Sequence, residues 1–332
     1  MNYESKGKIM KKSLLFYKIF MPITLGLTVI ALTFNILSLL LTFDMDIGTI
    51  KLPHPIPILF IVFITLATCA PIVLSILAKE TQTITRTKSG SLFYKIATIL
   101  LITALSAVVV FDVVILTKEL ISTSELLKLN VRLTFFDALS QHFEMARLFR
   151  AILTVPFIAY LVFEFIDNKS KNTFVARAVC NSLAILWCAL TPVVFYFFSG
   201  SPPMTEYMRV SYSIAFVLVT LFFLYDFKWN YLETNFRVYS GVSMVAAIFS
   251  LVLATATTIA VIARRDCLMI TNYWDFERGD VNFKYGIFDI YAVNLFEIIA
   301  LLALGIFILS KVISIIQTIV IVAKSEKEKE SK

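Results

Sequence analysis

The chain has 332 residues, of which 59% are hydrophobic and 16% are charged, with a mean hydropathy of +0.85 and a formal net charge of +7 at pH 7. This composition is too apolar for one water-soluble domain and too poor in charge for a disordered chain. The Lys and Arg residues lie between apolar runs and form no basic stripe interleaved with aromatic residues, which argues against nucleic-acid binding. We therefore expect an integral membrane protein.

Eight apolar runs approach or exceed the ~20 residues that a helix needs to cross hydrocarbon. The runs are continuous and do not alternate, so they indicate helices and not barrel strands. The sequence predicts an all-α, polytopic bundle of about eight transmembrane helices, at residues 20–43, 58–78, 96–116, 149–166, 178–198, 209–227, 238–263 and 288–310.

The segments around these runs complete the predicted organisation. A basic amino terminus over 1–19 precedes the eight-span domain of 20–310, and a C-terminal helix with a charged tail follows over 311–332. Two loops expected on the outer side are distinctive. The loop 117–148 has the spacing of amphipathic helices that lie on the membrane surface, and the loop 264–287 is rich in aromatic and charged residues.

Lysine and arginine residues predict the orientation of the chain. They are concentrated in the amino terminus, in alternate loops and in the C-terminal tail. By the positive-inside rule, both termini of this multi-pass protein are expected in the cytoplasm. Lys311 interrupts an apolar stretch after the eighth run. Either the helix bends there onto the membrane surface with Lys311 reaching the headgroups, or it continues as one long rod.

One sequence motif occurs twice. Leu-Phe-Tyr-Lys-Ile stands at 15–19 and again at 92–96, and the shift that aligns the copies also places Asn35 on Asp112. Two helices that start on the same side can converge on this motif, because Tyr and Lys both favour the headgroup zone. A duplication is the alternative, and the loop lengths then favour two parallel four-span halves.

Motifs of soluble enzymes are missing from the sequence. It contains no Gly-rich phosphate loop, no His-Glu-x-x-His pair and no Gly-x-Ser-x-Gly elbow. The two histidines lie outside the predicted spans, which excludes the histidine ligand sets of intramembrane metalloproteases, haem proteins and desaturases. The four cysteines fit neither a disulfide framework nor a metal-type spacing. We therefore expect no catalytic activity, no cofactor and no metal.

Three carboxyl groups fall inside predicted spans. A charge at the bilayer centre costs about 2.5 to 3.5 kcal/mol on insertion scales, so each carboxyl should find a partner. Glu164 is expected at the cytoplasmic interface, and Asp112 is near enough to the outer end of its span to reach the headgroups. Glu297 lies about nine residues into its run, or roughly 13 Å, and cannot easily reach water. It is the best candidate for a functional group.

The predicted polar site comprises Glu297, Asn294, Asp112 and Asn35. Asn294 lies three residues before Glu297 and shares its helix face. One interpretation is that these residues line a path for a proton or a cation. The alternative is a packing contact, in which a hydrogen-bonded Glu297 carboxyl ties the eighth span to Asn35 or Asn181.

Two functions follow from these observations. The favoured one is a non-catalytic protein that organises or assists other membrane components, with the lipid bilayer, other membrane proteins or a second copy of itself as partners. The alternative is a channel or transporter with Glu297 as a proton or cation site. Glycine is scarce inside the spans, which leaves few of the helix breaks that transporters use. Carboxyls around a hydrated cavity would favour transport, whereas a closed, dry bundle with a large apolar flank would favour organisation.

Overall fold

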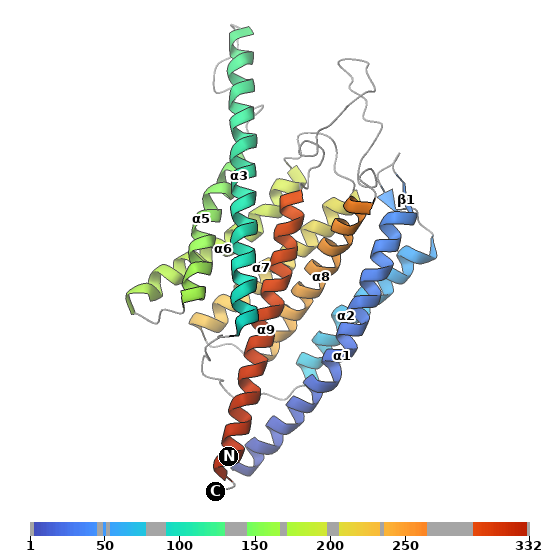
Figure 1. Cartoon of the computed structure of the whole chain (residues 1–332), viewed down its shortest axis with the longest axis vertical. Coiled ribbons are helices and arrows are strands. Elements are labelled where there is room, and N and C mark those ends of the chain that lie inside the picture. Colours follow the sequence, from blue (N-terminus) through green and yellow to red (C-terminus); the bar gives the residue numbers. More distant parts are fainter. Residues whose placement is uncertain are drawn as a thin grey trace.

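The structure is a computed structural model that describes residues 3–44, 49–50, 54–77, 91–129, 145–166, 171–197, 206–232, 236–263 and 295–330. Among these residues, eight helices are long and apolar enough to cross a membrane, which confirms the predicted eight-span helical bundle. Both chain termini lie at the same end of the bundle (Figure 1). The assignment of that end to the cytoplasm stays a prediction.

The described helices correspond one to one with the predicted spans. They are α1 (Tyr3–Leu41), α2 (Pro55–Leu77), α3 (Leu92–Leu129), α5 (Met145–Ile166), α6 (Lys171–Phe197), α7 (Glu206–Tyr231), α8 (Phe236–Ala263) and α9 (Leu295–Glu330). Two short antiparallel strands, β1 (Phe43–Asp44) and β2 (Thr49–Ile50), lie between α1 and α2. The largest departure from the predicted spans is the last one. It was expected at 288–310, and the apolar stretch of α9 is Phe296–Gln317.

Helix α9 decides between the two alternatives at Lys311. One continuous helix runs through this residue to Glu330, so the chain does not bend onto the membrane surface. Lys311 falls inside the apolar stretch of α9, and only 4% of the residue is exposed. The lysine therefore points into the bundle and not toward the headgroups.

Six of the helices form a closed ring. Each of α3, α5, α6, α7, α8 and α9 packs against the next, and α9 returns to α3. Helices α1 and α2 pack against each other and against α8, on the outside of this ring (Figure 1). These contacts join the first half of the sequence to the second, so the predicted four-span halves interlock and do not pack as separate units.

A cation on α8 anchors the end of α2. Arg237 Nε donates to the carbonyl oxygen of Ser75 at 2.6 Å, and its Nη2 donates to the carbonyl of Ile76. These carbonyls belong to the last turn of α2, where the oxygens receive no hydrogen bond from within the helix and a positive charge is favourable. One turn along α8, Gly241 lets the two helices approach closely, because a Cβ there would lie 3.0 Å from that of Ser75.

Aromatic side chains fill the middle of the ring. The ring centroid of Phe157 lies 5.3 Å from that of Trp187 and 5.1 Å from that of Phe223, and Phe223 lies 6.4 Å from Phe307. All four side chains are buried. They come from α5, α6, α7 and α9, so they close the ring interior with one packed layer. We call these four residues the aromatic layer.

Burial separates the central helices from the peripheral ones. The buried share of each helix's apolar stretch is 72% in α9 and 61% in α8, but only 28% in α1 and 22% in α2. The exposed side chains of α2 are large and apolar, as at Ile61 and Ile76. Such a surface suits contact with lipid chains, and α2 has the most of it among the eight helices described.

Candidate functional site

Charged side chains recur on α5 and α9 at the same interval. Arg150 and Glu164 are 14 residues apart on α5, and Glu297 and Lys311 are 14 residues apart on α9. This interval is about four helical turns, so the two charges on each helix share a face and lie about 21 Å apart. The order of the charges is reversed between the helices, and each charge on α5 pairs with its opposite on α9.

The distal network lies at the end of the ring away from the chain termini and consists of Asp112, Arg147, Arg150 and Glu297. Arg150 Nε donates to Asp112 Oδ2 at 2.9 Å, and Nη2 donates to the other carboxylate oxygen. Arg150 Nη1 lies 2.5 Å from Glu297 Oε1. Arg147, one turn earlier, donates to Asp112 Oδ1 at 3.5 Å. Two carboxylates therefore face two guanidinium groups, and the charges balance.

A hydroxyl extends the distal network to a further helix. Thr154 on α5 donates to the carbonyl of Arg150 at 2.8 Å, and its oxygen accepts the indole N–H of Trp187 at 2.7 Å. Trp187 belongs to α6 and to the aromatic layer. This contact connects the charged end of the ring to its apolar middle.

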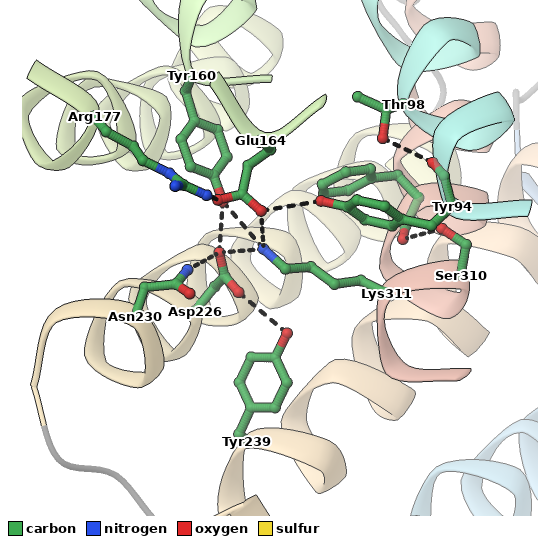
Figure 2. Close-up of polar contacts among 11 residues, drawn as sticks. Tyr94, Thr98, Tyr160, Glu164, Arg177, Asp226, Asn230, Tyr239, Ser310 and Lys311 are labelled. Atoms are coloured by element: carbon green, nitrogen blue, oxygen red, sulfur yellow. Dashed lines mark hydrogen bonds and ion pairs between the residues drawn. The ribbon is translucent and has the colours of Figure 1, made fainter. Parts of the chain in front are cut away.

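The proximal network lies at the end of the ring nearer the termini, and every ring helix contributes to it (Figure 2). Its members are Tyr94 of α3, Tyr160 and Glu164 of α5, Arg177 of α6, Asp226 and Asn230 of α7, Tyr239 of α8, and Lys311 of α9. All except Asn230 are at least nine-tenths buried. As at the distal end, two carboxylates balance two cations.

Asp226 is the most heavily bonded carboxylate of the proximal network. Its Oδ2 accepts from Lys311 Nζ at 2.8 Å, from the Tyr160 hydroxyl at 2.7 Å and from Asn230 Nδ2 at 3.1 Å. Its Oδ1 accepts from the Tyr239 hydroxyl at 3.1 Å. Four donors from four helices thus stabilise a single buried negative charge.

Glu164 is the second carboxylate of this network. Arg177 Nε donates to its Oε1 at 3.1 Å, with a further bond from Nη2, and the Tyr94 hydroxyl donates to Oε2 at 3.1 Å. Lys311 Nζ lies 3.4 Å from the same Oε2. The lysine ammonium therefore lies between two carboxylates (Figure 2).

The local sequence of α5 explains why one helix serves both networks. Its buried residues recur at intervals of three and four positions, which places them on one face of the helix. From the distal to the proximal end this face carries Arg150, Thr154, Phe157, Tyr160, Leu161 and Glu164. The face is charged at both ends and aromatic in the middle, as is the ring interior that it lines.

The structure brings together two of the four residues of the predicted polar site. Asp112 and Glu297 both bind Arg150. Asn35 is fully buried on α1, which packs outside the ring against α2 and α8. Asn294 lies outside the described residues.

The burial of the three carboxyls can be compared with the depths expected for them. Asp112 does not extend to the headgroups, because its side chain is fully buried against Arg150. Glu164 is close to the end of α5, as expected, but it is buried among the helices and bonded to Arg177. Glu297 lies in the first described turn of α9, and the part of the predicted run before Leu295 lies outside the described residues.

Six charged members of the networks were absent from the predicted site, and Glu164 was the one among them that had been considered as an interfacial carboxyl. The other five stand at or just beyond the ends of the predicted spans, where charges are ordinary: Arg147, Arg150, Arg177, Asp226 and Lys311. The equal spacing of opposite charges on α5 and α9 was the available signal. Because the order of the charges is reversed, this spacing predicts two ion pairs between the helices if they run in the same direction.

No protein-family model, curated protein or solved structure matches this chain. The chemistry available to the protein must therefore be judged from the two networks. Within each of them, the buried carboxylates are held by ion pairs with buried cations.

Proposed function

We propose that this multi-pass membrane protein is a transporter that moves protons or a small cation through the six-helix ring. The distal and the proximal networks close the two ends of the path. One observation carries the proposal: eight buried or nearly buried charges form two balanced sets at opposite ends of one ring, at Asp112, Arg147, Arg150 and Glu297 and at Glu164, Arg177, Asp226 and Lys311.

Stability alone does not account for these charges. A charged side chain within a span is costly, with a penalty of about 2.5 to 3.5 kcal/mol at the bilayer centre on insertion scales. Replacing a buried ion pair with apolar side chains of similar volume is often neutral or stabilising. An apolar seam would hold the helices together as well, so the charges favour a function in which ion pairs separate and form again.

The arrangement along the ring axis supports the same function. The aromatic layer lies between the networks, at Phe157 and Phe307 on the two helices that carry a charge at each end. A transporter closed at both ends needs such a dry middle, and either end can then open by separating its own ion pairs. Glu297 therefore acts as part of a closure with Arg150, and not as an isolated cation site.

A role in organising other membrane components is the second candidate. Two features favour it. The aromatic layer makes the ring interior closed and dry, as expected for an organising protein. The α1–α2 hairpin lies outside the ring, and little of its apolar stretches is buried. Under this function the networks would matter only for folding. Their removal as balanced pairs would then leave every property of the folded protein unchanged.

Flux through the reconstituted protein distinguishes the two candidates. The full chain is placed in liposomes that contain a pH-sensitive dye, and a potassium gradient with valinomycin sets the membrane potential. We expect proton entry, or sodium entry measured in parallel, above the level of protein-free liposomes. The double variant Asp226→Asn/Lys311→Met should lower this flux to the protein-free level.

Lys95→Met is the matched control for the flux experiment. Lys95 is an exposed lysine on α3, adjacent in sequence to Tyr94 but outside both networks. This variant should keep the flux of the wild type. If liposomes that contain the wild-type protein pass neither protons nor sodium above the protein-free level, the transport proposal is wrong and the organising role remains.

A further inference from the structure

The Lys311 ammonium lies in a cage made by other helices and by one turn of its own (Figure 2). Its Nζ is 2.8 Å from Asp226 Oδ2, 3.2 Å from the Tyr160 hydroxyl and 3.4 Å from Glu164 Oε2. The ring centroids of Tyr160 and Phe307 each lie 5.8 Å from the same nitrogen. Two carboxylates, a phenol oxygen and two aromatic rings thus surround a single positive charge.

These groups form a suitable site for a cation that is not attached to the chain. Carboxylate and phenol oxygens are hard ligands that suit small metal cations, and aromatic rings attract ammonium groups. Lysine carries its charge on a flexible four-carbon stem, so the ammonium can move away while α9 stays in place. The remaining side chains would then be free to bind another cation.

The charges of the network set the valence of that cation. Without Lys311, the two carboxylates Glu164 and Asp226 face only one cation, Arg177, which is bonded to Glu164. Asp226 keeps only the neutral donors Tyr160, Asn230 and Tyr239. One uncompensated negative charge remains, and it matches one monovalent cation.

A second observation points to a ligand at this end of the ring. Asn181 lies four residues after Arg177 on α6 and therefore on the same helix face. Its side chain is fully buried, and neither atom of its amide has a hydrogen-bond partner among the residues that the structure describes. Buried amides of native proteins are rarely left unpaired. The Asn181 oxygen provides a neutral ligand one turn deeper in the ring.

We propose that Lys311 occupies a monovalent cation site as a tethered substitute for the ion, and that sodium or a small primary ammonium ion takes its place when the lysine withdraws. Asp226, Glu164 and Tyr160 hold the ion, and Asn181 receives it on the side of the aromatic layer. The inference rests on the proposed function in treating the ring interior as the path, but binding alone tests it.

The experiment is a cation rescue of Lys311→Ala. The full-length variant is purified in detergent, and its thermal unfolding is followed by tryptophan fluorescence in sodium, methylammonium or N-methyl-D-glucamine chloride at equal ionic strength. Sodium or methylammonium should raise the Tm of the variant by roughly 2–8 °C over the bulky glucamine ion, because a bound ion stabilises only the folded state. The Tm of the wild type should be the same in all three salts.

Two further variants keep the test decisive. Lys311→Gln preserves most of the side-chain volume and should show the same rescue, which covers a failure of Lys311→Ala to fold. Lys311→Ala/Asp226→Asn removes the excess negative charge and should lose the response. A larger shift in sodium identifies an inorganic ion as the ligand, and a larger shift in methylammonium identifies an organic one.

Equal Tm values in the three salts for both single variants would overturn the inference, as would the failure of both to fold in every salt. The two proposals fail separately. Rescue of Lys311→Ala together with no flux through wild-type liposomes supports the cation site and removes transport. Flux without any rescue supports transport and removes the site.

Discussion

The distal and the proximal networks hold the same set of charges but connect different helices. The proximal network joins all six ring helices, whereas the described contacts of the distal network join α3, α5 and α9, with α6 reached through Thr154 and Trp187. Helices α7 and α8 take no part in the distal contacts that the structure describes. The described polar contacts therefore join all six ring helices at the proximal end, but only four of them at the distal end.

The cations differ as well. Both distal cations are guanidinium groups, which are planar and bind carboxylates in a fixed geometry, whereas Lys311 is a point charge on a flexible stem. Arg150 binds two carboxylates at once and is fully buried. Under the proposed function, we therefore expect the distal network to act as the tighter clamp, which opens less readily, and the proximal network to contain the group that moves first. Four substitutions test this division, and their expected effects decrease from the loss of Arg150 to the loss of the Tyr239 hydroxyl.

Loss of Arg150 should be the most damaging change. Arg150→Met leaves Asp112 and Glu297 buried with only Arg147 nearby, and a broken buried pair costs about 3–5 kcal/mol. The free energy of unfolding, measured in mixed micelles with increasing SDS, should fall by this amount. Arg147→Met is the control, because the side chain is 12% exposed and its contact with Asp112 is long, at 3.5 Å. Equal losses for the two variants would contradict the clamp.

Asp226→Asn should have the next largest effect. It removes the closest partner of Lys311 but leaves Glu164 at 3.4 Å, so we expect a loss of about 2–3 kcal/mol in the same unfolding measurement. Lys311→Met should relieve part of this loss in the double variant. The double-mutant cycle of Asp226→Asn and Lys311→Met should give a coupling free energy of about 1–3 kcal/mol between the two residues. Strictly additive losses would show that the pair is not the centre of the proximal network.

Gly305→Ala tests whether the spacing of α8 and α9 supports both networks. Gly305 lies on α9 between Glu297 and Lys311, and a Cβ there would lie 2.9 Å from Leu251 Cγ and 3.2 Å from the Leu251 backbone nitrogen. Forcing the helices apart should cost about 1–3 kcal/mol. Gly26→Ala is the matched control, because nothing lies within 4 Å of its Cβ position. Thermal unfolding should separate the two variants, and a wild-type Tm for Gly305→Ala would exclude this role.

Tyr239→Phe should have the smallest effect. It removes one of four donors to Asp226 and leaves the other three, so we expect a loss of about 0.6 kcal/mol, the mean for interhelical hydrogen bonds in a membrane. Tyr225→Phe is the control. It removes a hydroxyl from a tyrosine of α7 that is next to Asp226 in the sequence but is not a member of the proximal network. A loss above about 2 kcal/mol for Tyr239→Phe would mean that the network does not adapt to a missing donor.

The helices were predictable from the sequence, and their arrangement was not. Hydrocarbon thickness sets the length of a span, and an unbroken run of apolar residues reveals it. Which helices contact each other depends on the packing of side chains that are all similarly apolar. Nothing in the run 20–43 indicates that α1 packs against α8, and the contact of Arg237 with the end of α2 depends on that arrangement.

The site was predictable only in part for a related reason. Asp112 and Glu297 could be recognised because carboxyls are rare inside apolar runs. Lys311 was placed beyond the eighth span, because an isolated charge usually marks the end of a run. Its burial becomes favourable only when Asp226, 85 positions earlier in the sequence, neutralises it. A hydropathy profile evaluates one segment at a time and cannot register a charge compensated by another helix.

The position of α1 and α2 outside the ring has a consequence for the continuity of the chain. The six helices that carry both networks begin at Leu92, and every side chain described in the two networks belongs to them. The hairpin meets this assembly along α8, where Arg237 holds the last carbonyls of α2. We therefore expect two separate polypeptides, divided within 78–90, to reassemble in one membrane through these contacts between α2 and α8.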